Sequence, residues 1–109
     1  KLINKHIDSY NNYCIFTSIN EAIDKSLPGQ LILLSTGHYW ENNIVITKPL
    51  RIFGEIDNTR CIIELNGQLT IYESAKSIVI ANVTIRRARK VNRKVSCILN
   101  RGAILYMYN

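Results

Sequence analysis

A series of short apolar segments runs through the chain from Leu31 onward, and residues that favour turns separate them. The segments are 31–34, 44–46, 50–53, 61–64, 69–71, 78–80, 83–85, 95–99 and 103–108. Several alternate with a period of two, as in Leu50-Arg51-Ile52, which predicts strands with one face toward a core. Between them stand steps such as Asn42-Asn43 and Asn66-Gly67, which are typical of turns. The chain is therefore expected to be almost entirely β.

The spacing of these segments favours a solenoid over a sandwich. Grouped in threes as 31–53, 61–80 and 83–108, corresponding segments recur after roughly 22 to 34 residues, within the range of coiled repeats. No second helix is apparent that would make βαβ crossovers, and Asn66-Gly67 is the strongest hairpin signal. We therefore predict an all-β fold, a right-handed parallel β-helix of about three turns, or rungs. A small antiparallel sandwich with a hairpin at Asn66-Gly67 is the alternative.

One helix is predicted, over about residues 18–26. The sequence Ser18-Ile19-Asn20-Glu21 matches a capping box, in which the Ser and Glu side chains satisfy free backbone donors. An apolar stripe follows at helical spacing and comprises Ile19, Ala22, Ile23 and Leu27. Pro28-Gly29 ends the helix. We expect it to cover the N-terminal end of a β-helix domain spanning 17–109, after a lead-in over 1–16.

Three stretches of sequence resemble the pectin-lyase-like superfamily. They are 17–24 with 28–34 and 37–42, the segment 44–55 (Ile-Val-Ile-Thr-Lys-Pro-Leu-Arg-Ile-Phe-Gly-Glu), and 80–85 (Ile-Ala-Asn-Val-Thr-Ile). They look like the N-terminal cap and first coils of its right-handed β-helix repeats, of the carbohydrate-binding and sugar-hydrolase type found in F-box β-helix proteins. The resemblance covers about 16–85. It departs at Thr36, where the family usually has Pro.

The resemblance implies a fold more than an activity. Catalysis in this superfamily depends on carboxylates clustered on adjacent rungs, whereas the carboxylates of this chain are dispersed. They are Asp8, Asp24, Asp57, Glu21, Glu41, Glu55, Glu64 and Glu73. His6 and His38 have no carboxylate at metal-ligand spacing. We therefore expect no catalytic residues, no metal and no cofactor within the chain.

Two functions remain open on this evidence. The leading hypothesis is a non-catalytic interaction or scaffold module that presents a rigid surface to a protein partner within a larger protein. The alternative is a carbohydrate-binding or carbohydrate-active domain cut before its active coils. The aromatic residues Tyr39, Trp40 and Tyr72 could form a platform for stacking sugars, although burial is the favoured expectation for Tyr39.

The net charge of +6 resides in one short segment. Six basic residues stand close together there, Arg86, Arg87, Arg89, Lys90, Arg93 and Lys94. The other 8 Lys and Arg residues balance the 8 Asp and Glu residues. The segment is a solvated loop, a site for an acidic partner, or a site for nucleic acid or anionic lipid. Nucleic acid is disfavoured because no aromatic residue is interleaved for stacking.

Composition also indicates where the chain is located and whether it crosses a membrane. Cys14, Cys61 and Cys97 are odd in number and widely spaced, so free thiols and a reducing, intracellular and cytoplasmic location are expected. No apolar run approaches the roughly 20 residues that cross a bilayer, so we expect a soluble chain without a membrane span. The chain lacks an initiator Met, which favours a fragment of a longer protein.

The last apolar segment, 103–108, has no charge and no proline. Such a strand at the end of a solenoid presents an edge that invites pairing. The candidate end-to-end interface is therefore Ile104, Leu105, Tyr106, Met107 and Tyr108. A protein partner, or further rungs of the parent chain, is expected to cover it.

Overall fold

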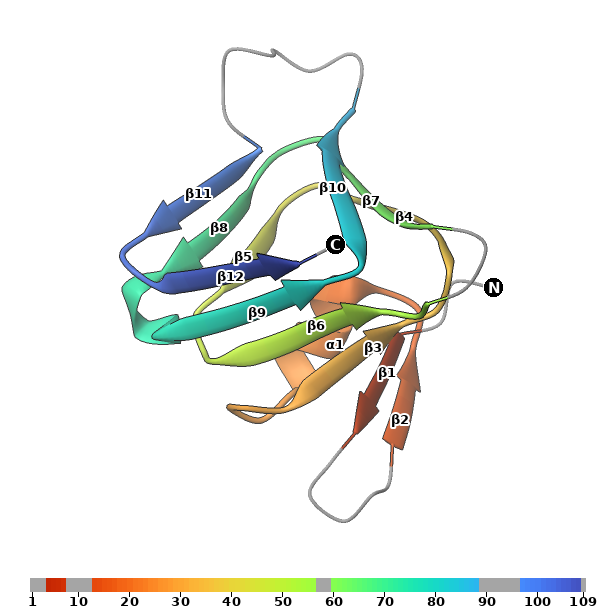
Figure 1. Cartoon of the computed structure of the whole chain (residues 1–109), viewed down its shortest axis with the longest axis horizontal. Helices are drawn as coiled ribbons and strands as arrows, with labels where there is room; N and C mark the ends of the chain where they lie inside the picture. The colour runs from red at the N-terminus through yellow and green to blue at the C-terminus, as the bar shows by residue number, and fades with distance from the viewer. Residues whose placement is uncertain (1–3, 8–12, 57–59, 89–96, 109) are drawn as a thin grey trace.

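The computed structural model describes residues 4–7, 13–56, 60–88 and 97–108, with backbone alone for 4–7 and 13–15. Three sheets make up most of it (Figure 1). Sheet A has the order β12 (Ile104–Tyr108), β9 (Ser77–Ala81), β6 (Leu50–Gly54), β3 (Leu31–Leu34), β1 (Asn4–Ile7) and β2 (Tyr13–Phe16). Sheet B has the order β10 (Val83–Arg87), β7 (Cys61–Leu65) and β4 (Gly37–Glu41). Sheet C has the order β11 (Ile98–Arg101), β8 (Leu69–Tyr72) and β5 (Ile44–Ile46), and a short 3₁₀ helix, η1 (Glu73–Ala75), follows β8.

The chain visits the three sheets in turn. It runs through β3, β4 and β5, then β6, β7 and β8, then β9, β10 and β11, and returns to sheet A as β12. Strands that follow one another within a sheet along this path are parallel. This confirms the predicted all-β parallel solenoid architecture. The sandwich alternative is wrong, because Asn66 and Gly67 join β7 to β8 in different sheets rather than forming a hairpin.

The predicted grouping of strands into coils is wrong by one strand. It omits β4, because this segment is Gly-His-Tyr-Trp-Glu, in which only Tyr39 is a buried apolar residue. With β4 included, β5 completes the first coil and β6 opens the second. The sequence analysis also did not predict the antiparallel pair of β1 and β2, of which β1 pairs with β3 in sheet A. The predicted segment 95–99 is a strand from Ile98 onward, and residues 95 and 96 lie outside the described residues.

Alternation between buried and outward residues builds the core. In β6, Leu50 and Ile52 are buried on either side of exposed Arg51, as predicted. The register then places similar side chains above one another on neighbouring strands, since Ile32 pairs with Ile52 and Ile52 with Ile80. Burying one such side chain contributes about 1.5–3 kcal/mol. Repetition of these columns explains why β-branched and aliphatic residues occupy the inward positions.

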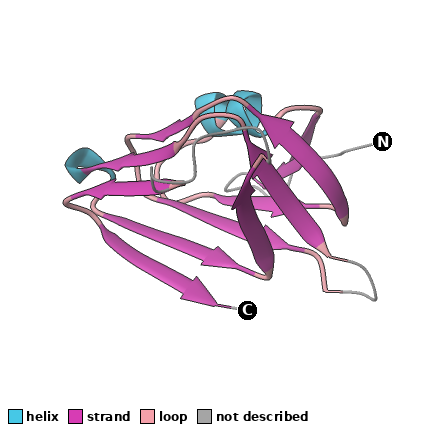
Figure 2. Cartoon of the chain, turned by 90° about the horizontal axis from the view of Figure 1, so that it is seen from above, coloured by secondary structure: helices cyan, strands magenta, loops and turns pink. Residues whose placement is uncertain are grey.

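Helix α1 (Ile19–Lys25) lies where the sequence predicts it, with Ser18 as its N-cap. Its buried face, formed by Ile19, Ala22 and Ile23, belongs to the same core as the strands. The helix contacts β1, β2, β4 and β5, and Figure 2 shows it to one side of the strands. It therefore covers the first coil. Leu27 was expected in the apolar stripe, but it follows the end of the helix and is 61% exposed.

The corners between sheets B and C are stacked polar turns. Asn66 Nδ2 donates to Asn42 Oδ1 at 3.0 Å, and Gln68 N donates to Asn43 Oδ1 at 2.9 Å. Gly67 N donates to the Asn42 carbonyl at 2.6 Å. A Cβ on residue 67 would lie 2.0 Å from Asn43 Oδ1, so this close approach requires glycine. The asparagine-rich turns of the sequence thus tie one coil to the next.

Neither of the cysteines whose side chains the structure describes forms a disulfide. Cys61 is buried and its Sγ lies 3.2 Å from the Ser35 carbonyl oxygen, while Cys97 is half-buried. This agrees with the expected free thiols at both positions, and the side chain of Cys14 lies outside the described residues. Within the described residues, no helix combines the length and apolar character needed to cross a bilayer.

Candidate functional site

The outer face of sheet B carries a cluster of polar and aromatic side chains, which we call the sheet B cluster. It consists of His38 and Trp40 on β4, Glu64 on β7 and Arg86 on β10. Trp40 pairs with Glu64, and Glu64 pairs with Arg86, so three strands place these residues in one row. His38 lies two residues before Trp40 on the same face of β4. Parallel stacking therefore brings together residues that are far apart in the sequence.

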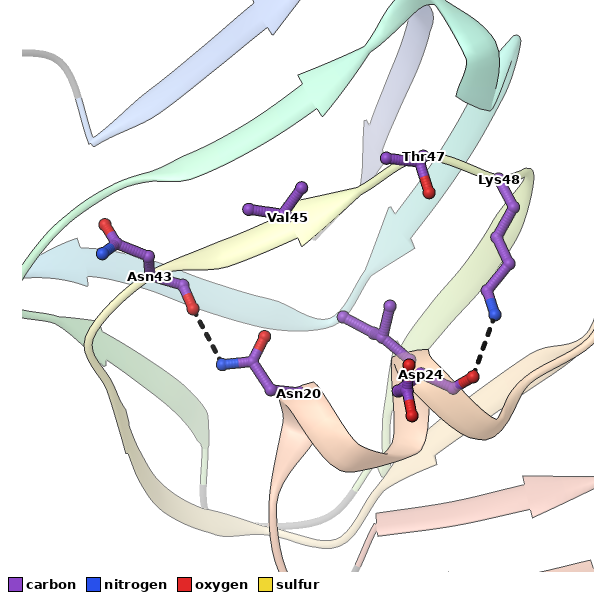
Figure 3. Close-up of a pocket in the computed structure, with 7 residues that line it drawn as sticks. Asn20, Asp24, Asn43, Val45, Thr47 and Lys48 are labelled. Carbon is purple, nitrogen blue, oxygen red and sulfur yellow. Dashed lines mark hydrogen bonds between the residues drawn. The ribbon is translucent and has the colours of Figure 1, made fainter.

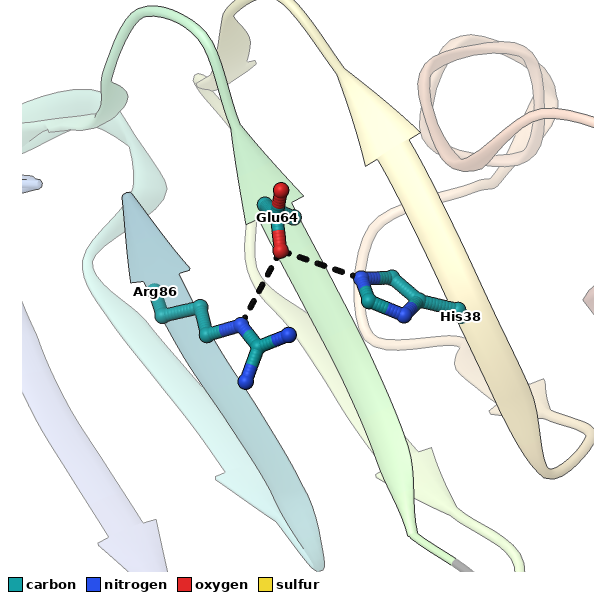
Figure 4. Close-up of polar contacts among 3 residues, drawn as sticks. All are labelled: His38, Glu64 and Arg86. Atoms are coloured by element: carbon teal, nitrogen blue, oxygen red, sulfur yellow. Dashed lines mark hydrogen bonds and ion pairs between the residues drawn. The ribbon is translucent and has the colours of Figure 1, made fainter. Parts of the chain in front are cut away.

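Direct contacts hold the sheet B cluster together (Figure 4). Arg86 Nε donates to Glu64 Oε1 at 3.0 Å, and His38 Nε2 lies 3.1 Å from the same oxygen. The rings of His38 and Trp40 are stacked, with centroids 4.1 Å apart and planes within 2°. Trp40 is nevertheless 61% exposed. The cluster thus presents an indole ring to solvent beside a paired carboxylate and guanidinium.

The contacts of Glu64 fix its charge. The hydrogen bond from Arg86 lowers the pKa of the Glu64 carboxyl and outweighs partial desolvation, which acts in the opposite direction. The hydrogen bond from His38 lowers the same pKa further. Glu64 is therefore ionised near neutral pH and neutralised by Arg86.

The predicted basic site is described only in part. Arg86 and Arg87 end strand β10, and the Arg86 side chain is 52% exposed. The other four candidates, Arg89, Lys90, Arg93 and Lys94, lie outside the described residues. Arg86 is thus part of a sheet face, where the sequence suggested the start of a loop.

The three candidate aromatic residues do not form one platform. Tyr39 is buried, as expected, and its hydroxyl donates to the Ser35 carbonyl, while burial raises the pKa of that hydroxyl. Tyr72 is 40% exposed on sheet C, where the Arg101 guanidinium lies 5.7 Å from its ring centroid. Trp40 alone of the three belongs to the sheet B cluster.

A polar groove lies between α1 and β5 (Figure 3). It has a volume of about 270 Å³ and is lined by Asn20, Ile23, Asp24, Asn43, Val45, Thr47 and Lys48. Asn20 Nδ2 donates to the Asn43 carbonyl at 2.7 Å, and Lys48 Nζ donates to the backbone oxygen of Asp24 at 3.3 Å. These bonds join the helix to the first coil. The groove is best explained as part of the contact between α1 and the first coil, which holds the helix in place.

Strand β12 forms one edge of sheet A. Four of the five residues in the predicted end-to-end interface, Ile104, Tyr106, Met107 and Tyr108, are exposed by 45% to 58%. Leu105 differs, because it is partly buried against the core. Side chains on both faces of this strand thus contact solvent.

Comparison of the chain with protein-family models, curated proteins and solved structures gives no match. Its site is therefore defined by geometry alone. In the part of the chain that the structure describes, no group of three or more His, Cys, Asp or Glu side chains could hold a metal ion.

Sequence reasoning considered Trp40, Glu64 and Arg86 separately and missed their association. The spacing between successive coils could have revealed this association. Glu64 and Arg86 are 22 residues apart and occupy equivalent places in successive coils. Recognising β4 as a strand would have added His38 and Trp40 to the same face.

Proposed function

We propose that the chain is a non-catalytic interaction module, which presents a rigid surface to a protein partner within a larger protein. In this proposal the fold is a right-handed parallel β-helix of about three rungs, related to the pectin-lyase-like repeats that the sequence resembles. The proposal includes an intracellular, cytoplasmic location, because cysteines that form no disulfide, as at Cys97, are typical of reducing compartments.

The observation that carries the proposal is the exposed edge of β12. In the part of the chain that the structure describes, β9 is the only strand that pairs with β12. An edge strand offers unpaired backbone N–H and C=O groups to a further strand. The exposed side chains of Ile104, Tyr106 and Met107 add apolar surface on both faces. A strand that joins this edge therefore gains both hydrogen bonds and apolar contacts.

The opposite end of the solenoid is already covered. Helix α1 packs on the first coil, and the hairpin of β1 and β2 continues sheet A beyond β3. The two ends therefore differ, and the docking strand belongs at the β12 end. We propose that it runs parallel to β12 and places side chains over Leu105 and Met107, as a further coil would.

Sedimentation of the purified chain over a wide concentration range tests whether the β12 edge recruits a strand, with a second copy of the chain as the probe. We expect concentration-dependent association, lost in a Tyr106→Lys, Met107→Lys variant because charge blocks the edge. Val45→Lys is the matched control, since Val45 is a 48% exposed strand residue on sheet C. A chain that stays monomeric at every concentration, with or without the substitutions, would contradict the proposed docking of a strand on the β12 edge.

Carbohydrate binding is a second candidate, and the exposed ring of Trp40 is the observation that favours it. Aromatic side chains stack on the apolar faces of sugars, and Glu64 and Arg86 lie beside the ring. The chain would then be a carbohydrate-binding or carbohydrate-active domain cut before its active coils. Saturable quenching of Trp40 fluorescence by oligogalacturonides would support this candidate, and unchanged fluorescence would exclude it.

A further inference from the structure

We propose that the sheet B cluster binds single-stranded nucleic acid, with a base stacked on Trp40 and a backbone phosphate paired with Arg86. This site is separate from the β12 edge, so the inference does not depend on the proposed protein partner.

The Trp40 ring has the exposure and support that a stacking platform requires. It is 61% exposed, and the parallel ring of His38 backs it at 4.1 Å. The contact between His38 and Glu64 in turn fixes the imidazole. A ring held in this way loses little conformational freedom when a base stacks on it. Stacking of bases on aromatic side chains is the common element of single-strand binding sites.

The net charge of the chain suits phosphate. Arg86 neutralises Glu64, and its side chain remains 52% exposed. The formal net charge is +6, and the six basic residues between positions 86 and 94 account for all of it. Arg86 is the member of this group whose contacts the structure describes, and it belongs to the sheet B cluster. Electrostatic attraction of this kind dominates the affinity of proteins for nucleic acids.

The fold brings an aromatic residue close to the start of the basic segment. No aromatic residue is interleaved in that segment, but Trp40 lies in the same row as Arg86, two strands away. This places their backbones about 10 Å apart on one face of sheet B. A long Arg side chain and an exposed indole ring can therefore contact neighbouring parts of one nucleotide chain.

The same contacts make a neutral sugar a poorer ligand. Glu64 Oε1 already contacts both Arg86 and His38, so one of the two carboxylate oxygens is no longer available to a sugar hydroxyl. A neutral glycan also gains nothing from the net charge, whereas a nucleic acid releases counterions when it binds.

Trp40 is the only tryptophan of the chain, so its fluorescence reports directly on the site. The chain is titrated with single-stranded oligouridylate and oligothymidylate of about 12 nucleotides. We expect saturable quenching by both, with affinity that falls between about 50 and about 200 mM salt. The logarithm of the affinity should fall with that of salt concentration by about 0.7 for each phosphate contacted.

Variants separate stacking from charge, with binding followed by the anisotropy of a labelled oligonucleotide. Trp40→Ala should weaken binding about tenfold or more and leave the salt dependence unchanged, and Trp40→Phe should retain part of the affinity. A Glu64→Gln, Arg86→Gln variant keeps the net charge but should bind more weakly, with a salt slope reduced by about 0.7. Tyr72→Ala is the control, because it removes an exposed aromatic residue with an adjacent Arg on sheet C.

Three results would overturn the inference, provided that circular dichroism shows each variant to be folded. The first is the absence of quenching by either oligonucleotide. The second is binding unaltered by Trp40→Ala, which would assign affinity to unspecific charge. The third is tighter binding of an oligogalacturonide than of either oligonucleotide, which would assign the site to an acidic glycan.

Discussion

The carboxylate of Glu41 caps the helix at Ile19, with Glu41 Oε2 3.2 Å from the backbone nitrogen of Ile19. Its other oxygen accepts a hydrogen bond of 2.8 Å from the side chain of Asn20. The sequence predicts a reciprocal capping box, and Ser18 does accept from the Glu21 N–H at 3.4 Å. Strand β4 supplies a further partner for the free donors at the helix start. The first coil thus stabilises the helix that covers it.

We expect Glu41→Ala to lower the free energy of unfolding by about 1–2 kcal/mol, because it removes a cap between two elements. Glu41→Gln keeps an acceptor for Ile19 and should cost less. Urea denaturation of both variants measures the difference. Equal stability of Glu41→Ala and the unmodified chain would show that the cap is dispensable.

The inward and outward positions of β9 should respond differently to charge. Ile80 is 2% exposed, so Ile80→Asp buries an unpaired carboxylate and should unfold the chain. Val79 faces outward and pairs with Arg51, so Val79→Asp should change stability by less than about 1 kcal/mol. Thermal denaturation followed by circular dichroism compares the two. Similar losses at both positions would contradict the alternation.

Gly67→Ala should destabilise the chain by about 1–3 kcal/mol, because the new methyl group would overlap the Asn42–Asn43 turn. Gly29→Ala is the control. Gly29 has a φ of 85° but open space around an added Cβ, so it reports conformational strain without steric overlap. A smaller loss at position 67 than at position 29 would contradict the close packing of the corners.

The outline of the fold was predictable because burial follows a short period. Alternation around Arg51 and the stripe from Ile19 to Ile23 depend on local sequence, and the structure confirms both. Strand β4 was not predictable in this way. Its pairing with β7 compensates for weak strand formers such as Gly37 and Glu41, and that pairing is a long-range interaction.

The site was harder to predict than the fold. Trp40, Glu64 and Arg86 form a row only because each coil places one of them at the same register. The lengths of the intervening turns set that register, and composition does not reveal it. Because β4 was not predicted as a strand, the sequence analysis did not predict that the residues of the sheet B cluster lie together.

The pairing of Glu64 predicts a specific dependence of stability on pH. Its pKa is lower in the folded chain than the ordinary value of 4.5, so its contribution is complete above that value and is lost as pH falls through the folded pKa. Glu64→Gln should therefore lose less stability than the unmodified chain between about pH 6 and about pH 3. Urea midpoints across this range measure it. Parallel curves for the two proteins would show that the ion pair contributes nothing.

We also expect no turnover of polygalacturonate or related glycans by this chain, with or without calcium. The prediction follows from the dispersed carboxylates, since lyases and hydrolases need such groups close together. Release of unsaturated or reducing ends measures activity. Turnover that a single Asp→Ala substitution abolishes would contradict the prediction.

The parallel ladders also determine how the chain can fold as it is synthesised. Ile32 pairs with Ile52, and Ile52 with Ile80, so each coil depends on contacts only about 20–30 residues away. Residues up to Tyr72 contain two complete strands of sheets B and C and the helix that covers the first coil. This part can form before β9 leaves the ribosome and then serve as a template for it. Translation and folding would then proceed in the same direction, one coil after another.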